Sequence, residues 1–347
     1  MSHKLVKFIH TYKDIISIEN LLSAWREFER DKRKRKDVQE FSLNLMNNIL
    51  SLHQDLTDKT YQHGEYIAFN INDPKPRNIH KALVRDRLLH HAIYRMLYPF
   101  FDKVFISDSF SCRNNKGTHK AMRRFEFFGR KVSINSTRIC HILKCDVRKF
   151  FASIDHKILL DILGSYIPDK DIVFLLSKIV GSFHSTKSAT GLGVGLPLGN
   201  LTSQLFVNIY MNEFDQFMRH KVRAEYYIRY ADDFVVFSRN RSYLAELIPK
   251  ISDFLEGKLR LSLHPDKVFI KTLASGMDFL GWIHFTNHRV IRTSTKQRMF
   301  RNIVACGGKP EVIQSYLGLL SHGNAYKLSQ EIVRSFIHDD TSRSSVW

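Results

Sequence analysis

The segment Tyr226-Tyr-Ile-Arg-Tyr-Ala-Asp-Asp-Phe-Val-Val-Phe237 places two carboxylates between two β-prone runs. Both runs are almost wholly apolar or aromatic, which predicts an antiparallel hairpin joined across residues 231–233. Asp is a common turn residue, so Asp232 and Asp233 could serve only to reverse the chain. The apolar flanks favour another interpretation, in which two diverging carboxylates lie beside a buried sheet. Carboxylates that are costly to hold close together indicate a cation between them.

A third carboxylate stands in the same kind of setting further upstream. The segment His141-Ile-Leu-Lys-Cys-Asp146 is predicted to be a buried strand that ends in a carboxylate. If this strand neighbours the hairpin, Asp146 and Asp232 can share a divalent ion, and oxygen ligands with a phosphate substrate favour Mg²⁺. Two such ions, about 3.5–4 Å apart, can activate a hydroxyl and stabilise a leaving phosphate. Composition and spacing alone leave purely structural carboxylates as an equal alternative.

The composition indicates a globular protein with a polyanionic partner. The chain has 347 residues, of which 44% are hydrophobic and 25% are charged. The 53 Lys and Arg residues outnumber the 34 Asp and Glu residues, so the formal net charge is +19. That excess is larger than the roughly 2–8 charges that suffice to keep a small domain soluble. It therefore points to nucleic acid or an anionic membrane surface as the partner.

The chain carries no sign of a membrane anchor, a disulfide framework or a zinc site. No segment approaches the roughly 18 apolar residues of a membrane span, and the N-terminus has no hydrophobic signal core. The four cysteines show no Cys-x-x-Cys pairing. The His90-His91 pair, His119 and His141 lack partners at ligand spacing, so we interpret them as surface or duplex-facing residues. We expect a soluble protein in a reducing compartment, bound to nucleic acid and not to a membrane.

Apolar spacing divides the rest of the chain into helical and extended segments. Residues 1–60 are predicted to be helical, and the basic run Lys32–Lys36 within them is interpreted as a solvated loop or, second, a phosphate contact. Two prolines around Lys75 favour an extended or looped segment over residues 61–80. Further helices are predicted near 82–100, 156–166, 200–220, 242–258 and 295–340, and further strands near 268–271 and on either side of 286–288.

With these segments in place, a set of motifs resembles the conserved blocks of reverse transcriptases. Tyr230-Ala-Asp-Asp233 resembles their YxDD box, and Asp146-Val-Arg-Lys-Phe-Phe151 resembles their first catalytic block. The fingers blocks of bacterial enzymes related to group II intron reverse transcriptases are resembled by Arg85-Asp-Arg87, followed by Ser109-Phe-Ser-Cys-Arg113 and Gly117-Thr-His-Lys-Ala121. Leu263-His-Pro-Asp-Lys267 resembles the palm block with a lysine, and Phe279-Leu-Gly-Trp282 resembles the primer grip. The blocks follow the family's order across residues 60–285.

One block narrows the resemblance to diversity-generating retroelement reverse transcriptases. Most reverse transcriptases carry Gln-Gly-x-x-x-Ser-Pro on the helix over the template base, whereas this chain has Leu198-Gly-Asn-Leu-Thr-Ser-Gln204. An aliphatic residue in place of the first Gln, and Gln in place of the Pro, is the retroelement pattern. The chain length agrees with it. No maturase-like or endonuclease extension follows the predicted thumb, which argues against an intact group II intron protein.

The resemblance implies which residues hold the metal ions and the incoming dNTP. Asp146, Asp232 and Asp233 match the catalytic carboxylates that bind two Mg²⁺ ions, for which Mn²⁺ can substitute, and the backbone of Val147 would also contact the metal. Two further groups of residues are implied. The dNTP would be bound by the backbones of Lys149 and Phe150 and by Phe151, Lys75, Arg77, Leu198, Gly199 and Lys267. The primer grip would be formed by Leu280 and Gly281.

Several of these implied roles have alternatives. Phe151 stands where an aromatic ring would clash with a ribose 2′-hydroxyl, but it could instead be a core residue. Arg77, with Lys75, resembles the fingers pair on the β- and γ-phosphates, and Arg85 or Arg87 could compete for that role. Lys267 could orient or protonate the leaving pyrophosphate, or it could simply hold the palm hairpin.

The implied fold is α+β, a right-hand polymerase with fingers, an antiparallel-sheet palm and a helical thumb. We expect an N-terminal helical basic extension over 1–60, the fingers and palm over 61–285, and the thumb over 286–347. The implied reaction is RNA-directed DNA synthesis, in which a primer 3′-hydroxyl attacks the α-phosphate of a dNTP. In the retroelements, a template-repeat RNA is copied into cDNA with errors at adenine.

The resemblance also implies partners and a location. The expected partners are the template RNA, the RNA/cDNA duplex, dNTPs and a small, basic, oligomeric accessory variability protein, in the cytoplasm of a bacterial or phage-infected cell. Leu198 cannot donate the hydrogen bonds of a Gln, so the nascent pair would be checked less strictly. The alternatives are a group II intron-derived or CRISPR-associated reverse transcriptase without adenine mutagenesis, another palm-fold nucleotidyltransferase, and an RNA-binding protein with an inactive site.

Overall fold

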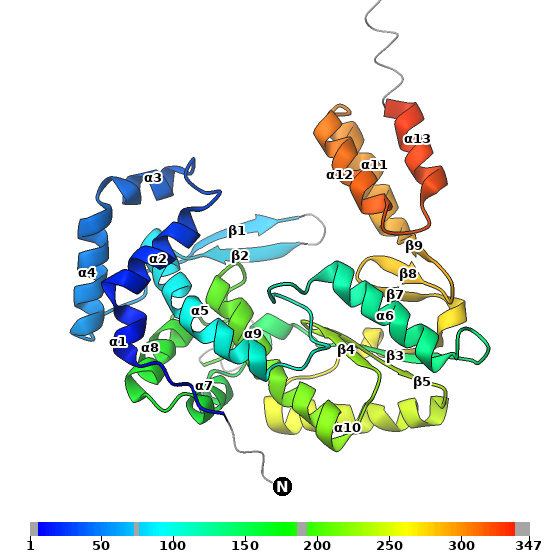
Figure 1. Ribbon diagram of the computed structural model, residues 1–347, viewed down its shortest axis with the longest axis horizontal. Coiled ribbons are helices and arrows are strands. Elements are labelled where there is room, and N and C mark those ends of the chain that lie inside the picture. The colour runs from blue at the N-terminus through cyan, green and yellow to red at the C-terminus, as the bar shows by residue number, and fades with distance from the viewer. Residues whose placement is uncertain (1–5, 73–75, 186–192, 337–347) are drawn as a thin grey trace, which may run out of the picture. The chain divides into compact units, whose positions relative to one another are not determined.

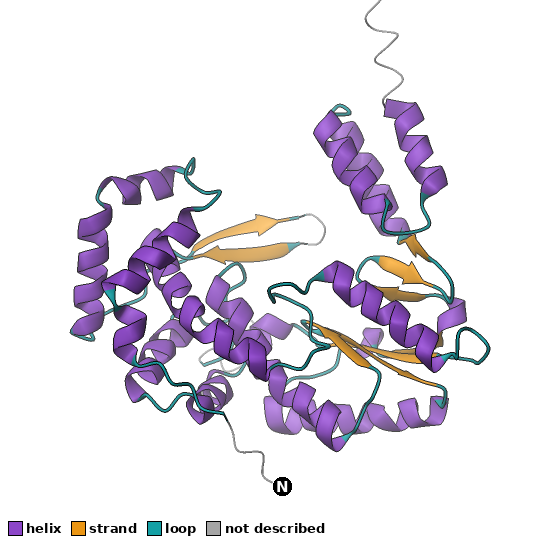
Figure 2. Ribbon diagram, viewed as in Figure 1, coloured by secondary structure: helices purple, strands orange, loops and turns teal. Residues whose placement is uncertain are grey.

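The computed structural model describes residues 6–72, 76–185 and 193–336 (Figure 1). The chain forms two compact units, each assembled from separate segments. The first unit comprises Met1–Gly117, Cys145–Phe234 and Ile248–Val268, and the second comprises Thr118–Lys144, Val235–Leu247 and Phe269–Trp347. Helices are combined with antiparallel strand pairs (Figure 2), so the predicted α+β class is confirmed.

The N-terminal segment is helical, as predicted. Its helices are α1 (Tyr12–Ile16), α2 (Ile18–Glu29), α3 (Lys36–Leu43) and α4 (Leu45–Thr57). Ser17 caps α2 by accepting a hydrogen bond from the backbone N–H of Asn20. The buried face of α2, which includes Trp25 and Phe28, packs on α5 (Val84–Val104). Most of the basic run Lys32–Lys36 lies exposed in the turn between α2 and α3, as the loop interpretation requires.

Residues 67–81 contain an antiparallel hairpin whose first strand is exposed and whose second strand is partly buried. Strand β1 (Ile67–Ile71) pairs with β2 (Arg77–Lys81), from Ile67 opposite Lys81 to Ile71 opposite Arg77. Every residue of β1 is exposed, including the apolar side chains of Ile67, Phe69 and Ile71. The extended conformation predicted for this segment is confirmed, while Lys75 lies outside the described residues.

A four-stranded sheet contains the strands that were predicted beside the three carboxylates. Its order is β4-β5-β3-β6. The strands are β3 (His141–Asp146), β4 (Tyr227–Tyr230), β5 (Asp233–Ser238) and β6 (Phe269–Thr272). β3 pairs antiparallel with β6, from His141 opposite Thr272 to Lys144 opposite Phe269. The interiors of β3 and β5 are buried. β5 is a continuous apolar run from Phe234 to Phe237, whereas β3 also buries Lys144, whose Nζ donates to the carbonyl of Asp278 at 2.7 Å.

Three α-helices that the structure describes between β3 and β4 belong to the first unit. They are α7 (His156–Tyr166), α8 (Lys170–Gly181) and α9 (Leu201–Gln216). Asp155 and Asp169 cap α7 and α8 with their side chains. Helix α9 is buried along most of its length and ends in a π-helical turn, Phe217–Lys221, so the helix predicted for 200–220 is confirmed. Helix α10 (Arg241–Leu259) matches the prediction for 242–258.

The second unit combines one amphipathic helix with a small sheet. Helix α6 (Thr118–Val132) buries Phe125, whose ring packs on Phe279 and Phe237 with centroid separations of 5.2 and 4.8 Å. The sheet has the order β7-β8-β9, with β7 (Met277–Phe279), β8 (Trp282–His284) and β9 (Arg289–Ile291). The β8–β9 pair is the short hairpin predicted around residues 286–288.

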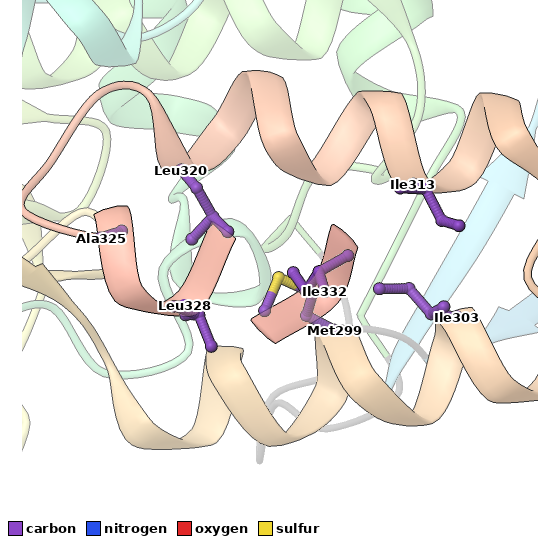
Figure 3. Packing of buried hydrophobic residues seen from close by; sticks show 7 residues of the cluster. All are labelled: Met299, Ile303, Ile313, Leu320, Ala325, Leu328 and Ile332. Atoms are coloured by element: carbon purple, nitrogen blue, oxygen red, sulfur yellow. The ribbon is translucent and has the colours of Figure 1, made fainter. Parts of the chain in front are cut away.

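A C-terminal helical bundle completes the second unit. It consists of α11 (Thr293–Ala305), α12 (Pro310–Leu320) and α13 (Tyr326–Phe336). The buried apolar side chains of these helices and of the α12–α13 turn form one cluster (Figure 3): Met299, Ile303, Ile313, Leu320, Ala325, Leu328 and Ile332. Among the described residues, no helix has the length and apolar composition needed to cross a bilayer.

Candidate active site

The turn that carries the paired carboxylates begins with an unusual backbone conformation. Ala231 follows β4 and has a φ of 57°, in the left-handed region that costs an L-residue roughly 1–2 kcal/mol. Asp232 completes the turn and Asp233 begins β5. A conformation of this kind persists only where neighbouring contacts hold it.

The backbone brings Asp146 and Asp232 together at the ends of neighbouring strands. β3 and β5 are adjacent in the sheet, and the N–H of Val147, directly after Asp146, donates to the carbonyl of Asp232 at 3.1 Å. Burial raises the pKa of the Asp232 carboxyl, and the charge of Asp146 raises it further, while Lys267 and Arg77 act in the opposite direction. Burial and the charge of Asp146 therefore destabilise the ionised form of the Asp232 carboxyl.

Asp233 lies in a different environment from Asp232. Burial raises the pKa of the Cys145 thiol, and the nearby charge of Asp233 raises it further. Cys145 precedes Asp146 on β3, so the two pairs, Asp232 with Asp146 and Asp233 with Cys145, follow the alternation of side chains along a strand. Asp232 thus shares its surroundings with Asp146, and Asp233 lies near Cys145.

The donor set fits a hard divalent cation. A cation beside Asp146 and Asp232 would offset both the burial of Asp232 and the repulsion between the two carboxylates. Mg²⁺ is usually bound by one or two protein carboxylates together with water and substrate phosphates. Over residues 6–72, 76–185 and 193–336, no three His, Cys, Asp or Glu side chains gather closely enough to hold a metal by themselves. A bound ion would therefore need backbone or substrate oxygens as well.

Lys267 supplies the positive charge next to these carboxylates. Its Nζ donates to Oδ1 of Asp146 at 2.8 Å, and the two side chains are 41% and 16% exposed. The 3₁₀ turn Pro265–Lys267 is held to β3 because the N–H of His264 donates to the Asp146 carbonyl at 2.8 Å. Lys267 therefore lies where it can contact either Asp146 or a ligand of the same cation.

In the segment after β3, the two adjacent phenylalanines differ in burial. Lys149 has a φ of 46° and leads into the 3₁₀ helix Phe150–Ser153. Phe150 is buried, whereas Phe151 is only half-buried and meets it edge to face with ring centroids 5.6 Å apart. The carbonyl of Phe151 accepts a hydrogen bond from Leu196 at 2.8 Å. Of the two rings, Phe150 is the core residue, and Phe151 keeps an exposed part.

The Leu198–Gly199 turn is bound to strand β2. The N–H of His80 donates to the Leu198 carbonyl at 2.9 Å. Gly199 has a φ of 105°, and a Cβ there would lie 2.7 Å from Cγ2 of Ile79. Asn200 is buried, and its Nδ2 donates to the His80 carbonyl at 2.8 Å. Asn200 was not predicted as a site residue, although a polar residue at the start of a helix is the signal that could have indicated it.

The arginines considered for the triphosphate differ in their partners. Arg87 donates to Asp37 at 2.6 Å, and Arg85 forms an ion pair with Asp55. Arg77 is exposed at the start of β2, and its charge acts on Asp232. Lys75 lies outside the described residues. Leu280 and Gly281 belong to the second unit, where they form the turn between β7 and β8 with φ values of 54° and 88°.

Two buried charges near the turn were also missed. Arg229 on β4 and Asp215 on α9 form an ion pair in which both side chains are 0% exposed. A single Arg inside an otherwise aromatic and aliphatic strand was the available signal.

The surface interpretation of His90 is wrong, because His90 is 1% exposed and its Nε2 lies 3.3 Å from Nε2 of His63.

Known proteins resemble this chain in sequence. Residues 71–284, more than half of the chain, match the family described as reverse transcriptase (RNA-dependent DNA polymerase). Protein YkfC of Escherichia coli K12 is 26% identical over 246 residues, which cover 61% of this chain and 62% of YkfC. The group II intron-encoded protein LtrA of Lactococcus lactis subsp. cremoris is 23% identical over 325 residues, covering 72% of this chain and 51% of LtrA. The chain thus spans about half to three fifths of the length of these relatives.

A solved structure shows the same fold. The structure of telomerase from Candida albicans, in complex with a fragment of telomeric RNA, superposes with a TM-score of 0.51 at 11% sequence identity. The match covers 81% of this chain and 58% of the telomerase chain. At that identity the likeness concerns the fold alone, and the right-hand polymerase fold is confirmed.

Proposed function

Since the chain belongs to the reverse transcriptase family, we propose that it is an RNA-directed DNA polymerase that extends a primer by template-directed addition of dNTPs. The observation that carries this proposal is the pairing of Asp146 and Asp232 at the ends of adjacent strands, beside Lys267 and within reach of the charge of Arg77. Nucleotidyl transfer needs such carboxylates at the point where a primer hydroxyl meets a triphosphate.

In this proposal Asp146, Asp232 and Asp233, with the backbone of Val147, hold the catalytic cations. Two bound Mg²⁺ ions, or Mn²⁺ in their place, would activate the primer 3′-hydroxyl and stabilise the charge of the leaving pyrophosphate. Asp146 and Asp232 keep the negative charge that retains a cation at the strand ends. Lys267 neutralises Asp146 when no cation is bound, because its Nζ is 2.8 Å from the Asp146 carboxylate.

The neighbouring residues would position the dNTP. The backbones of Lys149 and Phe150 would contact the triphosphate, and the exposed part of the Phe151 ring would exclude a 2′-hydroxyl by contact. Arg77, with Lys75, is favoured over Arg85 and Arg87 for the β- and γ-phosphates. Both competitors already pair with aspartates of the N-terminal helices, whereas Arg77 acts on Asp232.

We extend the proposal to the organisation of the chain. Residues 1–60 would form a basic helical extension, 61–285 the fingers and palm, and 286–347 the thumb. The bundle α11–α13, with its own buried cluster, supports the thumb assignment. Leu280 and Gly281, in a tight turn of the second unit, would form the primer grip that contacts the new strand.

The biological setting proposed is a diversity-generating retroelement. The Leu198-Gly199 block supports it, and the partners would then be a template-repeat RNA, the RNA/cDNA duplex and a small basic accessory protein in a bacterial cytoplasm. The products would carry errors opposite template adenine. A group II intron-derived reverse transcriptase without this bias is the second candidate, favoured by the 23% identity to LtrA.

Primer extension on an RNA template tests the activity. Asp232→Asn should abolish extension, because the turn tolerates Asn while the site loses a charge that is worth several kcal/mol to the transition state. The matched control is Asp253→Asn, which removes an exposed carboxylate from α10 in the same unit. A mutant that extends primers within about threefold of the wild type would contradict the assignment, since ~0.7 kcal/mol is too small for a metal ligand.

A further inference from the structure

Strand β4 buries a full positive charge two residues before the left-handed turn. Arg229 is 0% exposed and lies opposite Asp215 of α9, which is 0% exposed as well. Nε donates to Oδ1 of Asp215 at 2.8 Å, and Nη2 donates to Oδ2 at 2.6 Å. A buried ion pair does not by itself favour folding over a well-packed apolar pair. Its presence in the sheet therefore calls for a reason other than stability.

The guanidinium of Arg229 uses every donor it has. Two of its five N–H groups go to Asp215, and the other three have separate acceptors. Nη2 donates to Oγ of Ser109 at 3.0 Å, and Nη1 donates to Oδ1 of Asn208 at 3.3 Å and to the carbonyl of Ala231 at 3.1 Å. With all five donors engaged, the group has one orientation.

The acceptors around Arg229 are themselves held in place. Asp215 also accepts a hydrogen bond from the hydroxyl of Tyr227 at 2.8 Å, and Nδ2 of Asn208 donates to the carbonyl of Ser111 at 2.9 Å. The backbone of Arg229 is also held in place, because its N–H donates to the carbonyl of Asp108 and its carbonyl accepts from the N–H of Phe110, both at 3.0 Å. The hydrogen bond to Ala231 therefore comes from a rigid donor.

This hydrogen bond and one from Val147, directly after β3, hold the backbone on both sides of Asp232. The carbonyl of Ala231, before Asp232, accepts from Arg229 at 3.1 Å, and the carbonyl of Asp232 itself accepts from the N–H of Val147 at 3.1 Å. Each carbonyl defines one planar peptide group. Fixing the two groups that flank a residue fixes its φ and ψ, and so the direction in which the Asp232 side chain leaves the backbone.

We propose that Arg229 is a positioning residue that, locked by Asp215, holds the Ala231 turn so that the Asp232 carboxylate faces Asp146 and can bind a divalent cation with it. The proposal rests on the proposed function for its consequence in catalysis, but the effect on cation binding is independent of any reaction. Arg229 touches neither substrate nor cation and acts only through the carbonyl of Ala231.

Arg229→Lys separates positioning from stability. Lysine keeps the charge opposite Asp215, but it has three donors instead of five and no planar fork. The matched control is Arg113→Lys, since the Arg113 side chain is only 4% exposed and pairs with Asp102 at 2.7 Å. Its other hydrogen bonds go to the carbonyls of Asp102, Ile106 and Ser109. Both variants should lower the thermal midpoint, and only Arg229→Lys should alter the metal site.

The primary readout is Mn²⁺ binding to the full chain without primer, template or dNTP. Groups that orient metal ligands typically change metal affinity by about 10–100-fold. Arg229→Lys should weaken Mn²⁺ binding within that range and lower kcat to a similar degree, with the KM for dNTP changed by less than about threefold. Arg113→Lys should leave the Mn²⁺ isotherm as in the wild type.

A second variant covers the case in which Arg229→Lys does not fold. Arg229→Met with Asp215→Leu replaces the pair by apolar residues of similar size, an exchange that often preserves stability. It should fold and still bind Mn²⁺ about 10–100-fold more weakly. Wild-type Mn²⁺ affinity in a folded variant would overturn the proposal, and so would a shift of equal size in Arg113→Lys. If neither variant folds, the pair is a folding requirement and the proposal fails.

The two proposals can fail separately in these measurements. A wild-type chain that binds Mn²⁺ but does not extend a primer would refute the polymerase function and leave the positioning role open to the same binding comparison. A chain that extends primers, with Arg229 variants of unchanged cation affinity, would refute only the positioning role.

Discussion

Replacing Gly199 by alanine tests how closely the Leu198–Gly199 turn is held against strand β2. The backbone of Gly199 has a φ of 105°, which L-residues rarely adopt, and the added Cβ would lie 2.7 Å from Cγ2 of Ile79. Two separate costs follow from these two facts. One is backbone strain at Gly199, and the other is a steric conflict with a side chain of β2.

The two costs can be estimated from the structure. An L-residue in a left-handed conformation costs roughly 1–2 kcal/mol, and overpacking a well-packed contact costs about 1–3 kcal/mol. Ile79 is only half-buried, on a hairpin whose partner strand β1 is exposed. The hairpin can therefore shift, so we expect a loss of unfolding free energy of about 2 kcal/mol, near the lower end of the sum.

The displacement itself should affect activity. A shift of β2 away from Gly199 would lengthen the hydrogen bond from His80 to the Leu198 carbonyl and change the position of Arg77, at the start of the strand. If Arg77 contacts the triphosphate, the KM for dNTP should rise roughly tenfold, equivalent to about 1.4 kcal/mol of binding. The kcat at saturating dNTP should change less.

Two other glycines provide matched controls. Gly117 has a φ of 89° but no heavy atom within 4 Å of an added Cβ, so Gly117→Ala carries the strain alone. Gly164 lies within α7 with open space around it, and Gly164→Ala should stabilise by about 0.5–1 kcal/mol. Urea denaturation and steady-state primer extension measure both effects. If Gly199→Ala matches Gly117→Ala in stability and keeps the wild-type KM, the contact with Ile79 does not constrain the turn.

Three further predictions concern the ribose, fidelity and charge. Phe151→Ala should raise the kcat/KM for rNTP relative to dNTP by about 10–200-fold, and an unchanged ratio would mean that the ring does not contact the sugar. Leu198→Gln should lower misincorporation opposite template adenine more than opposite other bases, measured by sequencing cDNA from one RNA; an identical error spectrum would place the cause elsewhere. RNA affinity should fall steeply with salt, with a slope near −0.7 per phosphate contact. A nearly flat dependence would assign the net charge of +19 to solubility.

Local patterns in the sequence were sufficient to predict most elements and the candidate carboxylates. The hairpin around Asp232 and the strand ending at Asp146 are short, mostly apolar runs bounded by polar residues, and burial of such runs in a sheet depends little on distant sequence. The helices before residue 60 and after residue 293 could be predicted for the same reason, because their apolar residues repeat at helical spacing.

The partners of polar side chains were decided by tertiary structure alone. Arg229 and Asp215 lie on a strand and a helix, and nothing in either segment indicates that the two charges meet or that the pair reaches the Ala231 carbonyl. Lys267 contacts Asp146 from a segment far along the chain. Apolar burial is non-directional and can be predicted from periodicity, whereas a hydrogen bond needs two atoms within about 3 Å in the right orientation. Only the packed chain brings such atoms together. The sequence therefore predicts which carboxylates form the candidate site, and the folded structure determines their orientation.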